Sequence, residues 1–264
     1  MSLGKVPTAP TFRNRFFVLN GHFCYANNRL KVHSVLRKSF NDAVKRGLLA
    51  FNSCQRVDAP KHETKVGRAF SPEQMRTFLK EARTDRLHPF YVLAISTGCR
   101  QGELFELRWS DIDFEARELR ITRTLVDVHG KLVVGPPKSK KGVRTIPLSA
   151  VALEALQAQR TRLTREGLSG CELVFPDCKG GWLRRQNVLR RSYRPILKRS
   201  GVDPEFRFHD LRHSNATLLL VASDVDVKTV SEQLGHSRVQ VTLDLYVHGT
   251  DALSKRQLMR STQC

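Results

Sequence analysis

Two histidines and an arginine in one short segment are the residue types that could act on a phosphodiester. His209 and Arg212 lie three residues apart in Phe208-His209-Asp210-Leu211-Arg212-His213, a spacing that places both side chains on one face of a helix. A planar guanidinium binds two phosphate oxygens at once and stays charged at any working pH. An imidazole can accept or donate a proton near neutrality. The pair therefore suits work on a phosphate group.

Three further residues stand at positions of possible chemical interest. Arg100 follows the helix-breaking Gly98 and opens a predicted helix, His236 follows the end of another predicted helix, and Tyr246 lies ten residues beyond His236. Taken singly, each has an ordinary structural explanation: a surface ion pair, a polar helix terminus and a core aromatic ring. The functional indication comes from their order and spacing.

A metal site is an alternative explanation for the two histidines. His209 and His213 are four residues apart, as are paired metal ligands on some helices. Arg212 lies between them, however, and a guanidinium beside a divalent cation is electrostatically unfavourable. The sequence contains no glycine-rich phosphate loop, and its six cysteines are scattered without paired spacings. We expect free thiols, no metal, no ATP and no other cofactor, and we interpret His213 and His248 as structural.

The charge of the chain indicates a polyanionic partner. Among 264 residues there are 45 Lys and Arg against 25 Asp and Glu, which gives a formal net charge of +20. Nucleic acid is the commonest partner of such a surface, because each neutralised phosphate releases counterions. A membrane is the competing partner, but no apolar run is long enough to span a bilayer and the N-terminus lacks a secretory pattern. We expect a cytoplasmic protein without a membrane partner.

The N-terminal part of the chain has little regular pattern. Residues 1–30 are interpreted as irregular, and apolar residues at helical spacing then predict a helix from Val32 to Val44, with Gly47 as its stop. Residues 52–68 are polar and basic and are typical of a linker. Such a linker is either solvated or laid along a phosphate backbone, and the sequence does not distinguish these two possibilities.

The rest of the chain is predicted to be mainly α-helical with a small antiparallel three-stranded sheet. A capping Ser71 with Pro72 and Gln74 starts the first of these helices. Alternating β-branched residues between 118 and 147 predict a three-stranded antiparallel ribbon, with one turn at His129-Gly130 and a basic turn at residues 138–142. The other helices are expected at 90–96, 103–107, 151–164, 187–198, 209–222 and 227–234, and Pro195 should bend the fourth of these six.

Four segments, in their order along the chain, resemble the motifs of the tyrosine recombinase, or phage integrase, family. They are Thr97-Gly98-Cys99-Arg100-Gln101-Gly102-Glu103-Leu104, His209-Asp210-Leu211-Arg212-His213, Leu234-Gly235-His236 and Tyr246. The resemblance implies an integrase-like catalytic domain in which Arg100, His209, Arg212 and His236 surround the scissile phosphate and Tyr246 is the nucleophile. Family members also carry a lysine in a β-hairpin turn. Lys138 matches that position best, and Lys140 and Lys141 remain alternatives.

The resemblance implies DNA strand transfer without metal or ATP. Phosphoryl transfer builds charge on the phosphate oxygens, which two arginines and His236 would stabilise. His209 would accept the proton of Tyr246, and Lys138 would protonate the leaving 5′-oxygen. A 3′-phosphotyrosine would then store the diester energy for rejoining. The expected partners are double-stranded DNA, further copies of the chain in a homotetramer on paired DNA sites, and accessory DNA-bending proteins.

The domain organisation implied by the resemblance has four parts. These are an irregular segment (1–30), a partial helical core-binding region with its linker (31–68), the catalytic domain (69–249) and a C-terminal tail (250–264) that either docks on a neighbouring protomer or is frayed. Family members usually have a full helical DNA-binding domain before the catalytic one. Alternatives are therefore a truncated remnant that binds DNA without recombining it and an enzyme that only relaxes supercoils, with a metal-dependent nuclease least favoured.

Overall fold

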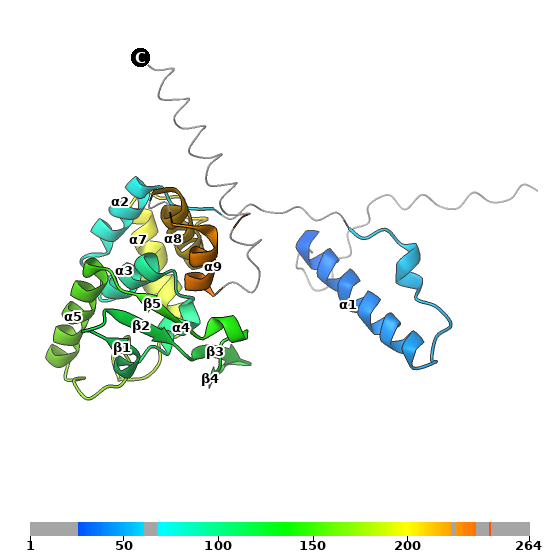
Figure 1. Cartoon of the computed structure of the whole chain (residues 1–264), viewed down its shortest axis with the longest axis horizontal. Helices are drawn as coiled ribbons and strands as arrows, with labels where there is room; N and C mark the ends of the chain where they lie inside the picture. The colour runs from blue at the N-terminus through cyan, green and yellow to red at the C-terminus, as the bar shows by residue number, and fades with distance from the viewer. Residues whose placement is uncertain (1–25, 61–67, 223–224, 236–242, 244–264) are drawn as a thin grey trace, which may run out of the picture. The chain divides into compact units, whose positions relative to one another are not determined.

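The computed structural model describes residues 26–60, 68–222, 225–235 and 243, drawn in colour in Figure 1. Contacts between residues divide the chain into one unit that ends at Lys65 and a second that begins at Val66. Among the described helices, none combines the length and apolar character needed to cross a bilayer. The predicted tail at 250–264 lies outside the described residues.

The first unit consists of one long helix and a short return segment. Helix α1 (Ala26–Lys45) covers the predicted helix and starts within the stretch that was expected to be irregular. Gly47 adopts a left-handed conformation, and its N–H donates to the Val44 carbonyl, so the predicted stop is confirmed. Asn52 donates from its side-chain amide to the Arg37 carbonyl. The first residues of the predicted linker therefore fold back onto α1.

The second unit has a central apolar helix. Helix α2 (Pro72–Ala82) begins with the predicted capping box of Ser71 and Gln74. Helix α3 (His88–Thr97) is apolar on all sides, and accordingly it contacts both α5 and α8. Gly98, in a left-handed conformation, ends α3, and the short helix α4 (Gln101–Phe105) follows at once. The chain thus turns sharply at Gly98, within the candidate motif at residues 97–104.

The strands form two sheets, and this differs in detail from the single predicted ribbon. A three-stranded antiparallel sheet in the order β1-β2-β5 contains β1 (Ile112–Asp113), β2 (Glu118–Ile121) and β5 (Arg144–Pro147). A separate hairpin contains β3 (Thr124–Val128) and β4 (Lys131–Gly135), joined at the predicted His129-Gly130 turn. The predicted basic turn is the connection from the hairpin to β5. The mainly α fold with a small three-stranded antiparallel sheet is confirmed, but its strands are not consecutive.

A long helix and a composite helical segment follow the sheets. Helix α5 (Ala150–Arg165) begins at the capping Ser149. The predicted helix at 187–198 is present as α6 (Arg185–Val188), a π-helical turn (Leu189–Tyr193) and α7 (Arg194–Arg199). The Arg194 N–H donates to the Leu189 carbonyl across the wide turn, immediately before Pro195. Since proline has no N–H to continue the ladder, it explains the irregularity at this point.

Two further helices follow α7 in the second unit, and Figure 1 shows them next to one another. Helix α8 (Phe208–Ala222) packs on α3, and α9 (Val227–Leu234) packs on α8 and β5. A cluster of buried aromatic rings joins α2, α3, the π-helical turn and α8; it contains Phe78, Phe90, Tyr91, Tyr193 and Phe208. This core fixes α8 and the end of α3 against one another.

Gly98 should be far less tolerant of substitution than a glycine in open space. Both Gly98 and Gly201 have a φ of +64°, but a Cβ at Gly98 would lie 2.5 Å from Leu234 Cδ2, whereas nothing lies within 4 Å of one at Gly201. Backbone strain should cost Gly201→Ala about 1 kcal/mol. Gly98→Ala adds a core clash and should lose about 3 kcal/mol. Urea unfolding of both variants measures the difference; equal losses would contradict the close packing of α3 on α9.

Candidate active site

A buried carboxylate lies at the centre of the candidate site. Glu103 on α4 is 2% exposed. It accepts hydrogen bonds from the backbone N–H of Arg100 at 2.8 Å and from Arg100 Nη1 at 2.8 Å. Arg100 is the N-cap residue of α4, so Glu103 caps the start of its own helix by accepting the Arg100 backbone N–H, and it also binds the Arg100 guanidinium. The position of the Arg100 side chain is therefore set by the start of its own helix.

Arg144, at the start of β5, binds the same carboxylate and was not predicted as a site residue. Its Nη1 and Nη2 lie 3.1 Å and 2.9 Å from the two oxygens of Glu103. Burial alone would raise the pKa of Glu103, but the Arg144 hydrogen bonds and the Arg100 charge outweigh it and hold that pKa below its usual range. Strand alternation places Arg144 on the same buried face as Ile146. A charged residue on an apolar face was the available sequence signal.

The C-terminal end of α9 binds three arginines through its backbone. Arg144 Nε donates to the Gln233 carbonyl at 2.6 Å. Arg212 Nη2 donates to the Leu234 carbonyl, and Arg100 Nη2 donates to the Gly235 carbonyl at 3.0 Å. These carbonyls have no partner within the helix and carry the negative end of its dipole. Gly235, in a left-handed conformation, turns the chain directly before His236.

Arg212 on α8 is buried against the end of α3. Its side chain is 2% exposed, and its Nη1 donates to the Gly98 carbonyl at 2.7 Å. Burial and the charges of Arg100 and Arg144 lower its pKa, although the guanidinium stays protonated at neutral pH. One turn further along α8, Asn215 donates to the carbonyls of Ile95 and Ser96. Helix α8 thus satisfies the last carbonyls of α3 while it carries Arg212 inward.

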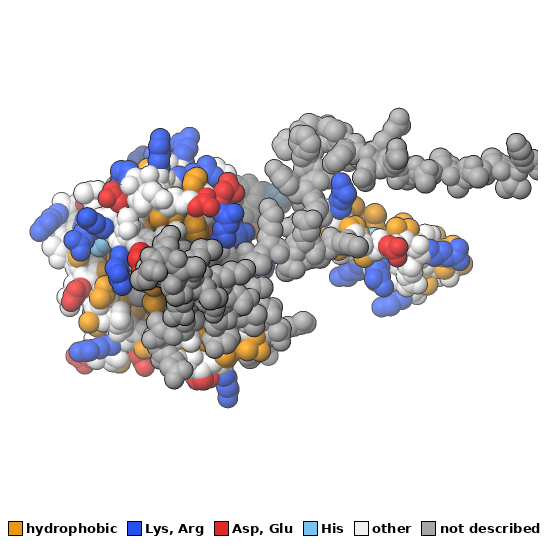
Figure 2. Space-filling model, turned by 90° about the horizontal axis from the view of Figure 1, so that it is seen from above, with side chains coloured by type: hydrophobic (Ala, Val, Ile, Leu, Met, Phe, Trp, Pro, Cys, Tyr) orange, Lys and Arg blue, Asp and Glu red, His pale blue; other side chains and the backbone are white. Residues whose placement is uncertain are grey.

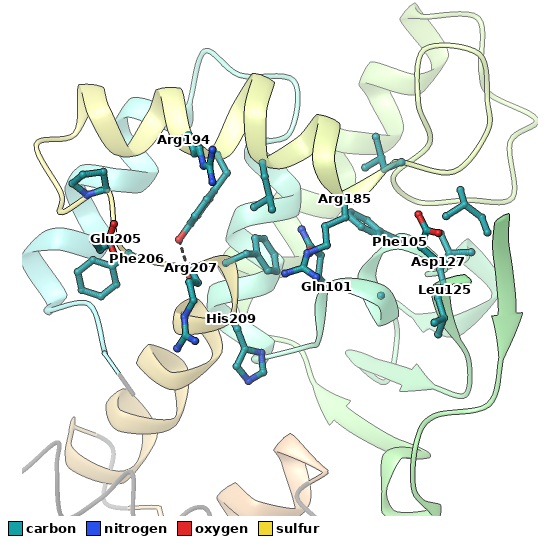
Figure 3. A pocket seen from close by; sticks show the side chains of 18 residues that line it. Gln101, Phe105, Leu125, Asp127, Arg185, Arg194, Glu205, Phe206, Arg207 and His209 are labelled. Carbon is teal, nitrogen blue, oxygen red and sulfur yellow. Dashed lines mark hydrogen bonds between the residues drawn. The ribbon is translucent and has the colours of Figure 1, made fainter. Parts of the chain in front are cut away.

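His209 lies beside this cluster at the start of α8. Partial loss of solvent, the neighbouring His213 ring and the Arg212 charge lower the pKa of His209 to about 4. The rings of His209 and His213 meet edge to face with centroids 4.8 Å apart. Figure 3 shows His209 with Gln101 and Arg185 around a groove of about 860 Å³. The structure thus brings together Arg100, Arg212 and His209, with His209 facing an open surface.

The remaining predicted site residues have different positions. Lys138 is exposed in the connection between β4 and β5, in which a short helical turn ends at Gly142, two residues before Arg144. His236 and Tyr246 lie outside the described residues. Within the described ranges, Cys99 is a buried free thiol whose pKa burial raises to about 11, and no group of three acidic, histidine or cysteine side chains is arranged to hold a metal.

The Glu103 carboxylate should stabilise the fold at neutral pH and cease to do so in acid. Because its folded pKa is depressed, its contribution is present above its ordinary pKa and is lost as pH falls through the folded value. At pH 7, Glu103→Gln should lose about 3 kcal/mol of unfolding free energy, since buried guanidiniums lose their counterion. The difference in unfolding free energy between Glu103→Gln and the parent protein should shrink below about pH 4. Urea unfolding across pH measures it, with the exposed Glu115→Gln as control; a pH-independent difference would contradict the ion pair.

His209 should remain neutral well below the ordinary histidine pKa. An NMR pH titration of its ring, assigned with His209→Gln, should give a midpoint near pH 4. The unfolded chain therefore binds more protons than the folded one between about pH 4 and 6.5, and stability falls as pH falls through that window. A short DNA duplex should move the midpoint upward, because phosphate charge favours the imidazolium form. A free-protein midpoint at 6.5 or above would place the ring away from the arginines.

Comparison with known proteins identifies the family. Residues 68–252 match the family model described as the phage integrase family. A tyrosine recombinase XerC-like protein of Caldanaerobacter subterraneus subsp. tengcongensis is 35% identical over 241 residues, which cover 82% of this chain and 61% of that protein. The ICEBs1 integrase of Bacillus subtilis is 30% identical over 219 residues, with 81% and 59% covered. The chain thus spans about three fifths of the length of these relatives.

Solved structures share the fold. The Tn1549 transposon integrase in complex with a circular intermediate DNA superposes with a TM-score of 0.72 at 22% identity, over 86% of this chain and 78% of that one. A lambda integrase dimer bound to a COC′ core site gives a TM-score of 0.60 at 21% identity, over 84% and 59%. The match to residues 68–252 settles the predicted resemblance: this chain belongs to the phage integrase family of tyrosine recombinases.

Proposed function

We propose that this chain is a site-specific DNA recombinase, which cleaves and rejoins double-stranded DNA through a covalent bond to Tyr246. Membership of the phage integrase family and the net charge of +20 support a DNA substrate. Relatives of this chain are named as integrases and tyrosine recombinases. The proposed partners are paired DNA sites, three further copies of the chain and accessory DNA-bending proteins.

The convergence of Arg100 and Arg212 is the observation that carries the proposal. Each donates two of its five N–H groups to the protein, and the other three have no partner among the described residues. Arg100 and Arg144 both bind the Glu103 carboxylate, and Arg212 donates to backbone carbonyls, so the cluster keeps an excess of positive charge. Charge that develops on the oxygens of a scissile phosphate would meet donors that are already in position.

The proposed reaction uses each candidate residue once. The Tyr246 oxygen attacks phosphorus, His209 accepts the phenolic proton, and the bond from phosphorus to the 5′-oxygen breaks as Lys138 protonates that oxygen. Arg100, Arg212 and His236 bind the phosphate oxygens. The 3′-phosphotyrosine keeps the energy of the diester, and attack by a 5′-hydroxyl reverses every step. Neither metal nor ATP enters this scheme.

Basic side chains near the candidate site would hold the DNA. Figure 2 shows separate patches of Lys and Arg side chains distributed around the visible surface. Exposed arginines on the first turns of α6 and α7, among them Arg185 and Arg194, line the groove that contains His209. We assign the catalytic domain to 69–249 and a partial core-binding region with its linker to 31–68, and we propose that the tail at 250–264 docks on a neighbouring protomer.

A covalent DNA adduct on Tyr246 is the decisive expectation. The purified protein is incubated in chelator with nicked suicide duplexes from its own genomic neighbourhood, quenched in denaturant and digested. Mass spectrometry should find a nucleotide attached to the Tyr246 peptide. The adduct should be absent from Tyr246→Phe, which lacks the nucleophilic oxygen, while duplex binding stays within about twofold, because one hydroxyl is lost among many phosphate contacts.

The other outcomes separate the alternatives. Duplex binding without any adduct would indicate a chain that binds DNA but does not recombine it. An adduct together with site-independent relaxation of supercoiled plasmid would favour a relaxing enzyme over a recombinase. Cleavage that chelator abolishes would indicate a metal-dependent nuclease and contradict the proposed chemistry.

A further inference from the structure

All five N–H groups of Arg144 are engaged by the protein. Its Nε donates to Gln233, its Nη1 donates to Glu103 and to the Gly142 carbonyl at 3.0 Å, and its Nη2 donates to Glu103 and faces Cys99 Sγ at 4.0 Å. The side chain is 5% exposed. A guanidinium has five N–H groups in a fixed fork, so none is left for a phosphate. Arg144 differs in this respect from Arg100 and Arg212.

The partners of Arg144 belong to three segments that are distant in sequence. Glu103 holds Arg100 at the start of α4, Gln233 lies in the last turn of α9 before His236, and Gly142 lies near the end of the loop that contains Lys138. The planar Arg144 guanidinium thus contacts the carboxylate that holds Arg100, the helix end that precedes His236 and the loop that contains Lys138. A lysine at this position would keep the charge but could not reach all of these acceptors from one nitrogen.

The loop that contains Lys138 is closed at its base. The Gly142 N–H donates to the Ser139 carbonyl at 2.8 Å, and a Cβ at Gly142 would lie 2.3 Å from Pro137 Cβ. Pro137 directly precedes Lys138. A hydrogen bond from Arg144 to the Gly142 carbonyl therefore fixes the point at which both ends of this loop meet.

We infer that Arg144 is a positioning residue that fixes the lysine loop relative to the two phosphate-binding arginines. This inference rests on the proposed function, in which Lys138 protonates the leaving 5′-oxygen. Arg144 does not touch the substrate. Its loss should therefore impair protonation of the leaving group more than binding of the phosphate by Arg212.

A change of leaving group distinguishes these two effects. One suicide duplex carries the ordinary 5′-oxygen at the cleavage site, and a second carries sulfur at that bridging position. A thiol ionises near pH 8.5, about seven units below water, so sulfur departs without a proton. Cleavage rates of the full chain are measured on both duplexes for the parent protein, Arg144→Lys, Lys138→Ala and Arg212→Lys.

Arg144→Lys should behave as Lys138→Ala does. On the oxygen duplex, both should lose about 100-fold or more, as for removal of a general acid. On the sulfur duplex, both should come within about tenfold of the parent rate. Arg212→Lys should lose about 100-fold on both duplexes, because its defect concerns the phosphate oxygens and not the leaving group.

A second variant avoids disturbing the buried ion pair. Gly142→Ala would force the loop away from Pro137 through its Cβ, while Gly135→Ala has nothing within 4 Å and is the matched control. Gly142→Ala should show the same sulfur rescue, and Gly135→Ala should cleave both duplexes at the parent rate. This pair tests the loop even if Arg144→Lys fails to fold, which its melting temperature and duplex binding report.

The outcomes separate the inference from the proposed function. A parent protein that cleaves neither duplex refutes the proposed function and the inference with it. A parent protein that cleaves both, with equal losses on oxygen and sulfur for Arg144→Lys and Gly142→Ala, overturns the inference alone. Selective sulfur rescue of either variant, together with its absence in Arg212→Lys, supports it.

Discussion

The hydrogen-bonded pair of Glu103 and Arg144 is the interaction on which the candidate site depends. The buried guanidiniums of Arg144 and Arg212 lie near the half-exposed one of Arg100, and their mutual repulsion and lost hydration would be costly without a counterion. Glu103 supplies that counterion from a residue that is itself buried. Because the carboxylate also caps its own helix, its position is set by local backbone geometry. The ion pair can therefore hold Arg100 and β5 in fixed relation.

Backbone carbonyls do the rest of the positioning, and this choice of acceptor matters. The end of α9 holds one N–H group from each arginine without adding a full negative charge. Carboxylates in the same places would neutralise the guanidiniums and compete with a phosphate. Neutral carbonyls fix the geometry and leave the positive charge available. The combination of one carboxylate and one helix end yields a cationic, preorganised site.

Much of this arrangement was predictable from sequence, for reasons that are local. Capping residues such as Ser71, the break at Gly98 and the helical spacing of His209 and Arg212 are each encoded within a few neighbouring residues. Strand pairing, in contrast, is not local. The alternation of residue types indicates which face of a strand Val126 or Ile146 lies on, but not which strand pairs with it. One ribbon was therefore predicted where two sheets exist. Arg144 belongs to no motif, and its role depends on Glu103 and Gln233, which lie 41 and 89 residues away.

The same long separations tie the site to the integrity of the whole second unit. The bonds from Arg100 to Gly235 and from Arg212 to Gly98 span 135 and 114 residues, so no isolated segment can assemble the arginine cluster. Glycines at the two meeting points leave room for close neighbours: a Cβ would lie 2.5 Å from Leu234 Cδ2 at Gly98 and 2.8 Å from the Lys141 carbonyl oxygen at Gly235. A change that loosens the packing of α3, α8 or α9 would therefore displace the arginines relative to one another. Geometry, more than the inventory of charged residues, decides whether this cluster can bind a single phosphate.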